Sequence, residues 1–159
     1  MDAPRRSIGL CDHSLVDAWE EPAEEDLIPQ DCANPNPKDS LYRIFSEYYP
    51  NGMKAALAEA FDLVQNTFGN DPKCQILKKS SKDGVSLFAD QSIDFLYLDA
   101  NHRFDFVFAD LERWQSKVSE NGFILLNDCY VSPVGRQQHI SVLEALSSFL
   151  KYYEWIPVA

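Results

Sequence analysis

Residues 92–128 read SIDFLYLDANHRFDFVFADLERWQSKVSENGFILLND, and this stretch decides the fold. Ile93 to Asp99, IDFLYLD, is almost continuously apolar up to Asp99 at its C-terminal end, which is typical of a strand in a parallel sheet whose two faces are both covered by helices. Phe104 to Val118 repeats apolar residues at helical spacing. A turn at Asn121-Gly122 then leads to a second buried strand, Phe123 to Leu126. The stretch therefore predicts a strand, a helix and a second strand parallel to the first.

The neighbouring segments continue the alternation. Towards the C-terminus, Ser141 to Tyr153 is predicted to be an amphipathic helix and Trp155 to Val158 to open another strand. Towards the N-terminus, Cys74 to Leu77 reads as a strand and Ser81 to Phe88 as a short helix capped by a serine. We therefore expect an α/β fold with a Rossmann-like, open, mostly parallel sheet and helices on both faces.

The first part of the chain is less regular. Ser14 to Val16 runs into Asp17 and predicts a short buried strand that ends there. Residues 20–40 are rich in proline and acidic residues, which indicates a long loop or lid. From Ser40 to Phe68 apolar residues recur at three- and four-residue steps, so two helices separated at Pro50-Asn51-Gly52 are expected.

Composition narrows the class of protein. A chain of 159 residues with 45% hydrophobic residues is expected to form one globular domain, residues 1–159. Its formal charge of −11 argues against nucleic acid as a partner, because a grip on phosphates needs clustered Lys and Arg. No apolar run approaches the roughly 20 residues that span a bilayer, and the start of the chain lacks the apolar stretch of a signal peptide. A cytoplasmic protein without a membrane partner is predicted.

The four cysteines, at positions 11, 32, 74 and 129, have no CxxC or CxxH spacing. A zinc site and a disulfide framework are therefore not expected, and the thiols are predicted to be reduced and mostly buried.

Polar side chains follow three of the predicted strands. Asp17, Asp99 and the pair Asn127-Asp128 each stand where a strand ends. In open parallel sheets ligands bind beyond the carboxyl ends of the strands, so we expect these side chains to converge along one rim and frame a cleft. The alternative is that strand-end Asp and Asn only cap helices or shape turns. Three such positions on one edge favour a site.

Two runs carry a resemblance to a known family. The first is SIDFLYLDANHRFDFVFADLERWQSKVSENGFILLNDCY, with YLDANH at its core, and the second is LVDAWEEP at residues 15–22. Both resemble class I S-adenosylmethionine (SAM)-dependent methyltransferases of the small-molecule O-methyltransferase-like, methyltransferase-24 type, over most of residues 13–130. The resemblance implies methyl transfer from SAM to a small-molecule acceptor, with an oxygen as the expected methyl-accepting atom.

The resemblance also implies roles for single residues. Asp17 would accept hydrogen bonds from the ribose hydroxyls of SAM, with Trp19 flanking the same pocket, and Ser80 and Ser81 would approach the adenine. The turn under the methionine part of SAM and the methyl acceptor would be formed by Asp99, Ala100, Asn101 and His102. Within it Asp99 and His102 are the catalytic candidates, with His102 as general base. A purely structural histidine is the alternative.

A metal site is a further implication. Asp99, Asn127 and Asp128 provide oxygen donors similar to those of magnesium-dependent O-methyltransferases, in which the ion holds vicinal hydroxyls and favours the alkoxide. Asn precedes Asp in this chain, so only two carboxylates remain. Many relatives have no metal, and both alternatives stay open.

The chain also departs from the family. Its glycines, at 9, 52, 69, 84, 122 and 135, never form the GxGxG-type loop that lies against the cofactor. If Asp17 ends the second strand of the family's fold, the sheet is incomplete at its N-terminal strand: either the chain is a fragment or truncated product, or a partner chain supplies the strand. An exposed sheet edge would favour a homo-oligomer.

Two other functions compete with methyl transfer. One is a non-catalytic module of the same fold that serves binding or assembly, its cofactor site lost. The other is a different nucleotide-binding α/β enzyme, because fold alone does not determine chemistry.

Overall fold

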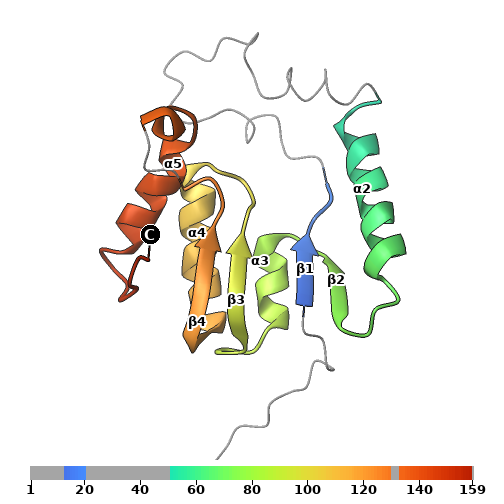
Figure 1. Cartoon of the computed structure of the whole chain (residues 1–159), viewed down its shortest axis with the longest axis horizontal. Helices are drawn as coiled ribbons and strands as arrows, with labels where there is room; N and C mark the ends of the chain where they lie inside the picture. The colour runs from blue at the N-terminus through green and yellow to red at the C-terminus, as the bar shows by residue number, and fades with distance from the viewer. Residues whose placement is uncertain (1–12, 21–50, 130–132, 159) are drawn as a thin grey trace, which may run out of the picture. The chain divides into compact units, whose positions relative to one another are not determined.

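The computed structural model describes residues 13–20, 51–129 and 133–158 (Figure 1). The predicted 20–40 lid and the first of the two predicted helices before Phe68 lie outside these residues, apart from Glu20. Within the described residues the chain divides into two compact units, the first ending at Ala89 and the second beginning at Asp90. The single domain over residues 1–159 stays a prediction.

The first unit contains a two-stranded parallel sheet. Strand β1 (His13–Asp17) pairs with β2 (Cys74–Lys78), and Asp17 stands opposite Lys78. Both strands were predicted. The expected burial of β1 is wrong, because Leu15 is 39% exposed and only Val16 is half-buried.

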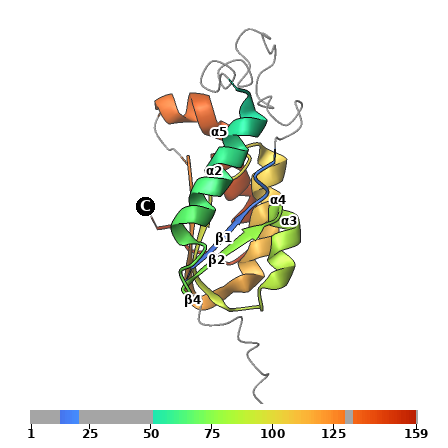
Figure 2. The ribbon, with the colours of Figure 1, turned by 90° about the vertical axis from the view of Figure 1, so that its right-hand side faces the viewer.

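Two helices flank that sheet, one on each side of its ribbon (Figure 2). Helix α2 (Met53–Phe68) confirms the predicted second amphipathic helix and ends at Gly69. Helix α3 (Ser81–Gly84) continues as the 3₁₀ turn η2 (Val85–Leu87), so the short helix expected before Phe88 is confirmed. A Cβ atom on Gly84 would lie 2.5 Å from Val16 Cγ1, so only glycine lets α3 approach β1 this closely.

The second unit contains the predicted strand, helix and parallel strand. Strand β3 (Ile93–Leu98) pairs with β4 (Val118–Leu126), and α4 (Phe104–Trp114) with the 3₁₀ turn η3 (Gln115–Lys117) connects them. The α-helix ends before the expected Val118, which is instead the first residue of β4.

Asn121-Gly122 lies inside β4 rather than in a turn, near a shift in the β3–β4 register. A Cβ atom on Gly122 would lie 3.0 Å from both the Asp94 and the Ile93 carbonyl oxygens and 2.6 Å from Val118 Cγ1. The glycine therefore permits a close approach of the two strands. Asn-Gly is a common turn dipeptide, so the sequence alone suggests a turn and does not show this role.

The core of this unit lies between α4, α5 (Pro133–Phe149) and one face of the sheet. Its fully buried members are Val107, Leu111, Val142, Ala145 and Phe149, and Leu98, Ile124 and Leu126 of the two strands pack against them. Helix α5 begins earlier than the expected Ser141 and ends before Tyr153. The strand expected from Trp155 is wrong: the chain there has no regular structure, and Ile156 is 87% exposed.

The opposite face of β3 and β4 is exposed. Phe95 and Phe123 pair across the strands and are 61% and 63% exposed. Tyr97 and Leu125 form the next pair on this face, and they are 49% and 50% exposed. Helices α4 and α5 both pack on the other side of this pair of strands. The described strands form two parallel pairs, and the predicted α/β class is confirmed.

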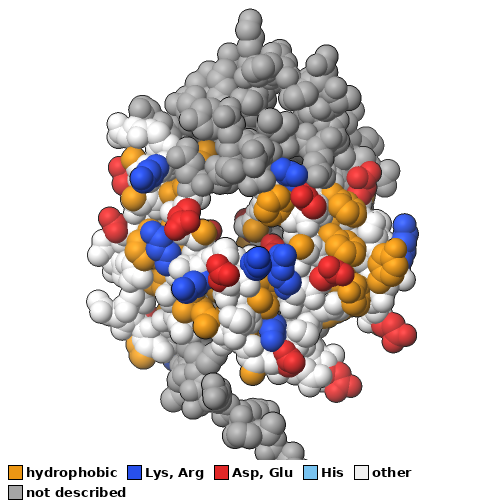
Figure 3. Space-filling view, turned by 180° about the vertical axis from the view of Figure 1, so that it is seen from behind, with side chains coloured by type: hydrophobic (Ala, Val, Ile, Leu, Met, Phe, Trp, Pro, Cys, Tyr) orange, Lys and Arg blue, Asp and Glu red, His pale blue; other side chains and the backbone are white. Residues whose placement is uncertain are grey.

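Among the described residues seen in Figure 3, acidic and basic side chains both occur. No helix among the described residues is both long and apolar enough to cross a membrane. Cys74 and Cys129 are half-buried and form no disulfide, while Cys11 and Cys32 lie outside the described residues.

Candidate functional site

Hydrogen bonds fix the turn that follows β3 at both of its ends. The Asn127 N–H donates to the Leu98 carbonyl oxygen at 2.9 Å, which ties the ends of β3 and β4 together. The Asn101 side chain accepts a hydrogen bond from the Arg103 N–H at 2.9 Å, an Asx turn that leads directly into α4. Residues 99–102 are therefore held between a strand end and a helix start.

Asp99 and Asn127 meet at this edge, as predicted. The Asn127 Nδ2 group donates to Asp99 Oδ1 at 3.0 Å. The Tyr97 hydroxyl lies 2.8 Å from Asn127 Oδ1 and 3.2 Å from Asp99 Oδ2. A phenol has one proton to donate, and the shorter distance favours Asn127 as its acceptor. Tyr97 was not among the predicted site residues, although it lies two residues before Asp99 near the end of β3, a spacing that places both on one face.

His102 lies between two carboxylates. Its Nε2 is 3.4 Å from Asp99 Oδ1, and its Nδ1 is 3.5 Å from Asp128 Oδ2. Asp128 has a left-handed backbone with φ 51°, a conformation that few residues other than glycine, Asn and Asp adopt. The structure thus brings together the two predicted catalytic residues, Asp99 and His102, and both residues of the predicted Asn127-Asp128 pair.

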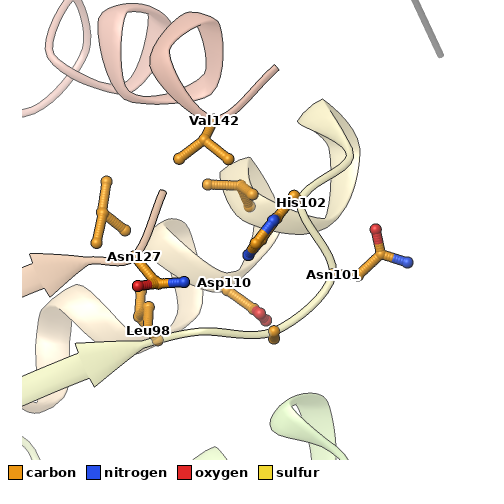
Figure 4. A pocket seen from close by; sticks show the side chains of 9 residues that line it. Leu98, Asn101, His102, Asp110, Asn127 and Val142 are labelled. Atoms are coloured by element: carbon orange, nitrogen blue, oxygen red, sulfur yellow. The ribbon is translucent and has the colours of Figure 1, made fainter. Parts of the chain in front are cut away.

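A small pocket lies beside this turn (Figure 4). Its apolar walls are Leu98, Ala100, Val107, Leu126 and Val142, and its polar lining is Asn101, His102, Asp110 and Asn127. Asp110 is only 7% exposed and lies 3.5 Å from Arg113 on the same helix. Sequence reasoning missed Asp110, although it stands at helical spacing on the buried side of α4 with Val107 and Trp114.

The predicted magnesium ligands Asp99, Asn127 and Asp128 lie together at this strand end. Both oxygens of Asp99 and the amide oxygen of Asn127 lie within 3.2 Å of a protein hydrogen-bond donor. Each of these oxygens has a second lone pair, so these contacts do not exclude coordination. Among residues 13–20, 51–129 and 133–158 no group of three His, Cys, Asp or Glu side chains is arranged to hold a metal, and the ligand set, which includes an Asn, stays a prediction.

Asp17 and Trp19 are brought together at the end of β1. Asp17 Oδ1 accepts a hydrogen bond from the Trp19 N–H at 2.6 Å, and Trp19 has a left-handed backbone with φ 45°. The Trp19 ring meets the Phe61 ring edge-on at 5.1 Å, and the Lys78 ammonium group lies 4.9 Å from the Phe61 centroid. The expectation that Asp17 shares a rim with Asp99 stays a prediction.

Ser80 and Ser81 follow directly on β2 in the same unit. The Lys79 N–H donates to the Asp17 carbonyl oxygen at 2.9 Å, so the serines come just after the residue that bonds to the end of β1. The Ser80 hydroxyl caps α3: it accepts from the Asp83 N–H at 3.2 Å and donates to Asp83 Oδ2 at 2.8 Å. Of the two predicted adenine contacts, Ser80 therefore already has a structural task.

Comparison with known protein families gave a match that covers this site. The profile of the family described as "Methyltransferase domain" matches residues 11–129, which is more than half of the chain. The matched segment includes Asp17, Asp99, His102, Asn127 and Asp128. Comparisons with curated proteins and with solved structures gave no significant match.

Proposed function

Because the chain belongs to the methyltransferase domain family, for which SAM is the implied methyl donor, we propose that it methylates an oxygen of a small-molecule acceptor. The observation that supports this most is the meeting of Asp99, Asn127 and Asp128 around His102, inside the matched segment. A carboxylate pair around an imidazole, at the carboxyl ends of two parallel strands, suits acceptor deprotonation beside a bound cofactor.

The proposed SAM contacts follow the family pattern. Asp17 would bind the ribose hydroxyls through Oδ2, because Oδ1 already accepts from the Trp19 N–H. Trp19 would flank that pocket. Ser81 is the better candidate for the adenine edge, because the Ser80 hydroxyl is engaged in the helix cap. The methionine part would lie against the turn formed by Asp99, Ala100, Asn101 and His102.

The proposed reaction is an in-line displacement. The acceptor oxygen attacks the methyl carbon, the bond from that carbon to sulfur breaks, and S-adenosylhomocysteine leaves. His102 takes the proton of the acceptor hydroxyl on one ring nitrogen, where the hydroxyl replaces the carboxylate that faces this nitrogen in the structure. The carboxylate at the other ring nitrogen holds the ring and offsets the charge that it gains. Most of the acceleration would come from holding the two reactants in line.

A binding or assembly module of the same fold is the competing proposal. It is favoured by the isolated spacing of the glycines, none of which forms the family's glycine-rich loop within these 159 residues. Such a module would keep the fold and bind no SAM.

The direct test is methyl transfer from isotope-labelled SAM to a panel of small hydroxyl, carboxyl and amine acceptors. We expect labelling of a hydroxyl acceptor, and a loss of about 100-fold or more in His102→Ala, since a general base contributes 10²–10⁴-fold. Glu59→Ala on the exposed side of α2 is the control and should keep full activity. Labelling of amine acceptors alone would refute methyl transfer to oxygen. Activity that does not change when a metal chelator is added would refute a metal requirement.

A further inference from the structure

Tyr97 joins the exposed apolar face of β3–β4 to the polar cluster at the strand ends. Its ring pairs with Leu125 on the face that α4 and α5 leave uncovered. Its hydroxyl reaches past the end of β3 to both Asn127, 30 residues away in sequence, and Asp99. It is therefore the side chain that links the two strands to the cluster from the sheet side.

The two oxygens of Asp99 face different partners. Oδ1 lies 3.0 Å from Asn127 Nδ2 and 3.4 Å from His102 Nε2, whereas Oδ2 lies 3.2 Å from the Tyr97 hydroxyl. The Tyr97 hydroxyl also lies 2.8 Å from Asn127 Oδ1, which leaves the amide nitrogen to face Asp99. Without that hydroxyl the amide and the carboxylate would each lose one of the contacts that fix their orientation, and the Asn127 Nδ2–Asp99 Oδ1 hydrogen bond would have to hold both.

We propose that Tyr97 is a positioning residue, whose hydroxyl orients the Asn127 amide and the Asp99 carboxylate so that Asp99 faces His102. The expected effect of Tyr97 on catalysis rests on the proposed methyltransferase function. The expected effect of Tyr97 on the orientation of Asn127 and Asp99 does not, so the two expectations can be refuted separately. Tyr97→Phe removes the hydroxyl oxygen from a residue that is 49% exposed and leaves the ring, and Tyr152→Phe removes the same atom from a residue that is 75% exposed beyond α5.

The first measurement is nuclear magnetic resonance of the full chain without ligand. In Tyr97→Phe we expect the Asn127 side-chain amide and His102 ring signals to shift, while Tyr152→Phe leaves them unchanged. Unchanged signals in Tyr97→Phe, in a protein whose backbone spectrum shows it folded, would overturn the proposal whether or not the chain transfers methyl groups.

The second measurement is steady-state kinetics with an acceptor found by the labelling screen. Tyr97→Phe is expected to lower kcat on the order of tenfold and to change the KM for SAM much less, because it disturbs orientation rather than binding surface. In an Asn127→Ala background the same change should cost clearly less, since one of its two partners is already gone. Equal, additive losses in both backgrounds would contradict action through Asn127. Absence of methyl transfer by the unmodified chain would instead refute the proposed function.

Discussion

At the scale of single residues, the backbone of Asp128 is the most specialised feature of the site. Its φ of 51° lies in the left-handed region, and the side chain is directed to within 3.5 Å of His102. Positive φ values in residues other than glycine gather at functional sites, where surrounding structure holds them in place. Position 128 therefore needs a residue that tolerates a left-handed backbone, and it also needs a carboxylate beside His102.

Three substitutions separate these two requirements. Asp128→Gly and Asp128→Asn fit the left-handed backbone, whereas Asp128→Ala does not, so Asp128→Ala should unfold about 1 kcal/mol more readily than Asp128→Gly. Urea unfolding measures this difference. All three should lose methyl transfer, because each removes the carboxylate beside His102. An alanine variant at least as stable as the glycine variant would contradict the account of the backbone.

The identity of the polar cluster could be predicted from sequence only in part. Asp99, Asn127 and Asp128 were found because polar residues at strand ends stand out against apolar runs. Tyr97 and Asp110 were not, since an aromatic inside a strand and a charge inside a helix look like ordinary members of those elements. Their roles depend on which face meets which neighbour, and that is set by tertiary packing.

At the scale of elements, the contact between α4 and α5 organises the second unit. The Tyr153 hydroxyl just beyond α5 donates to Glu112 Oε1 on α4 at 2.9 Å. This hydrogen bond, with desolvation and the Glu112 charge as further causes, raises the pKa of Tyr153. The phenol is therefore more easily ionised in the unfolded chain than in the folded one.

The raised pKa of Tyr153 predicts how the stability of the folded chain changes at alkaline pH. Because the folded-state pKa is the higher one, the stabilisation is complete below the unfolded value of about 10 and disappears as pH rises through the folded value. Tyr153→Phe should therefore be less stable than the unmodified chain at pH 8, and the difference should shrink above pH 10. Unfolding in urea at both pH values measures it, with Tyr152→Phe as control. A difference that stays constant would argue against this hydrogen bond.

The elements themselves followed from sequence more fully than their surroundings. β3, α4 and β4 were predicted because their apolar patterns are long and regular. The pattern of β3 could not show that Leu96 and Leu98 point to one face and Phe95 and Tyr97 to an exposed one, since both sets are apolar. Likewise, Asn121-Gly122 resembled a turn, and only the close approach of β4 to β3 shows why glycine is needed.

At the scale of the whole molecule, the proposed function requires this chain to bind SAM through the strand-end residues of the matched segment. Residues 11–129 contain Asp17 at the end of β1 and Asp99 beyond β3, and SAM is the methyl donor that the family implies. Removing either carboxylate should therefore weaken binding.

Calorimetric titration of S-adenosylhomocysteine into the full chain tests this most directly. We predict micromolar binding by the unmodified chain and by Glu59→Ala, and a loss of affinity of tenfold or more, about 1.4 kcal/mol, in both Asp17→Ala and Asp99→Ala. No binding by the unmodified chain up to millimolar ligand, or undiminished affinity in the two variants, would contradict it.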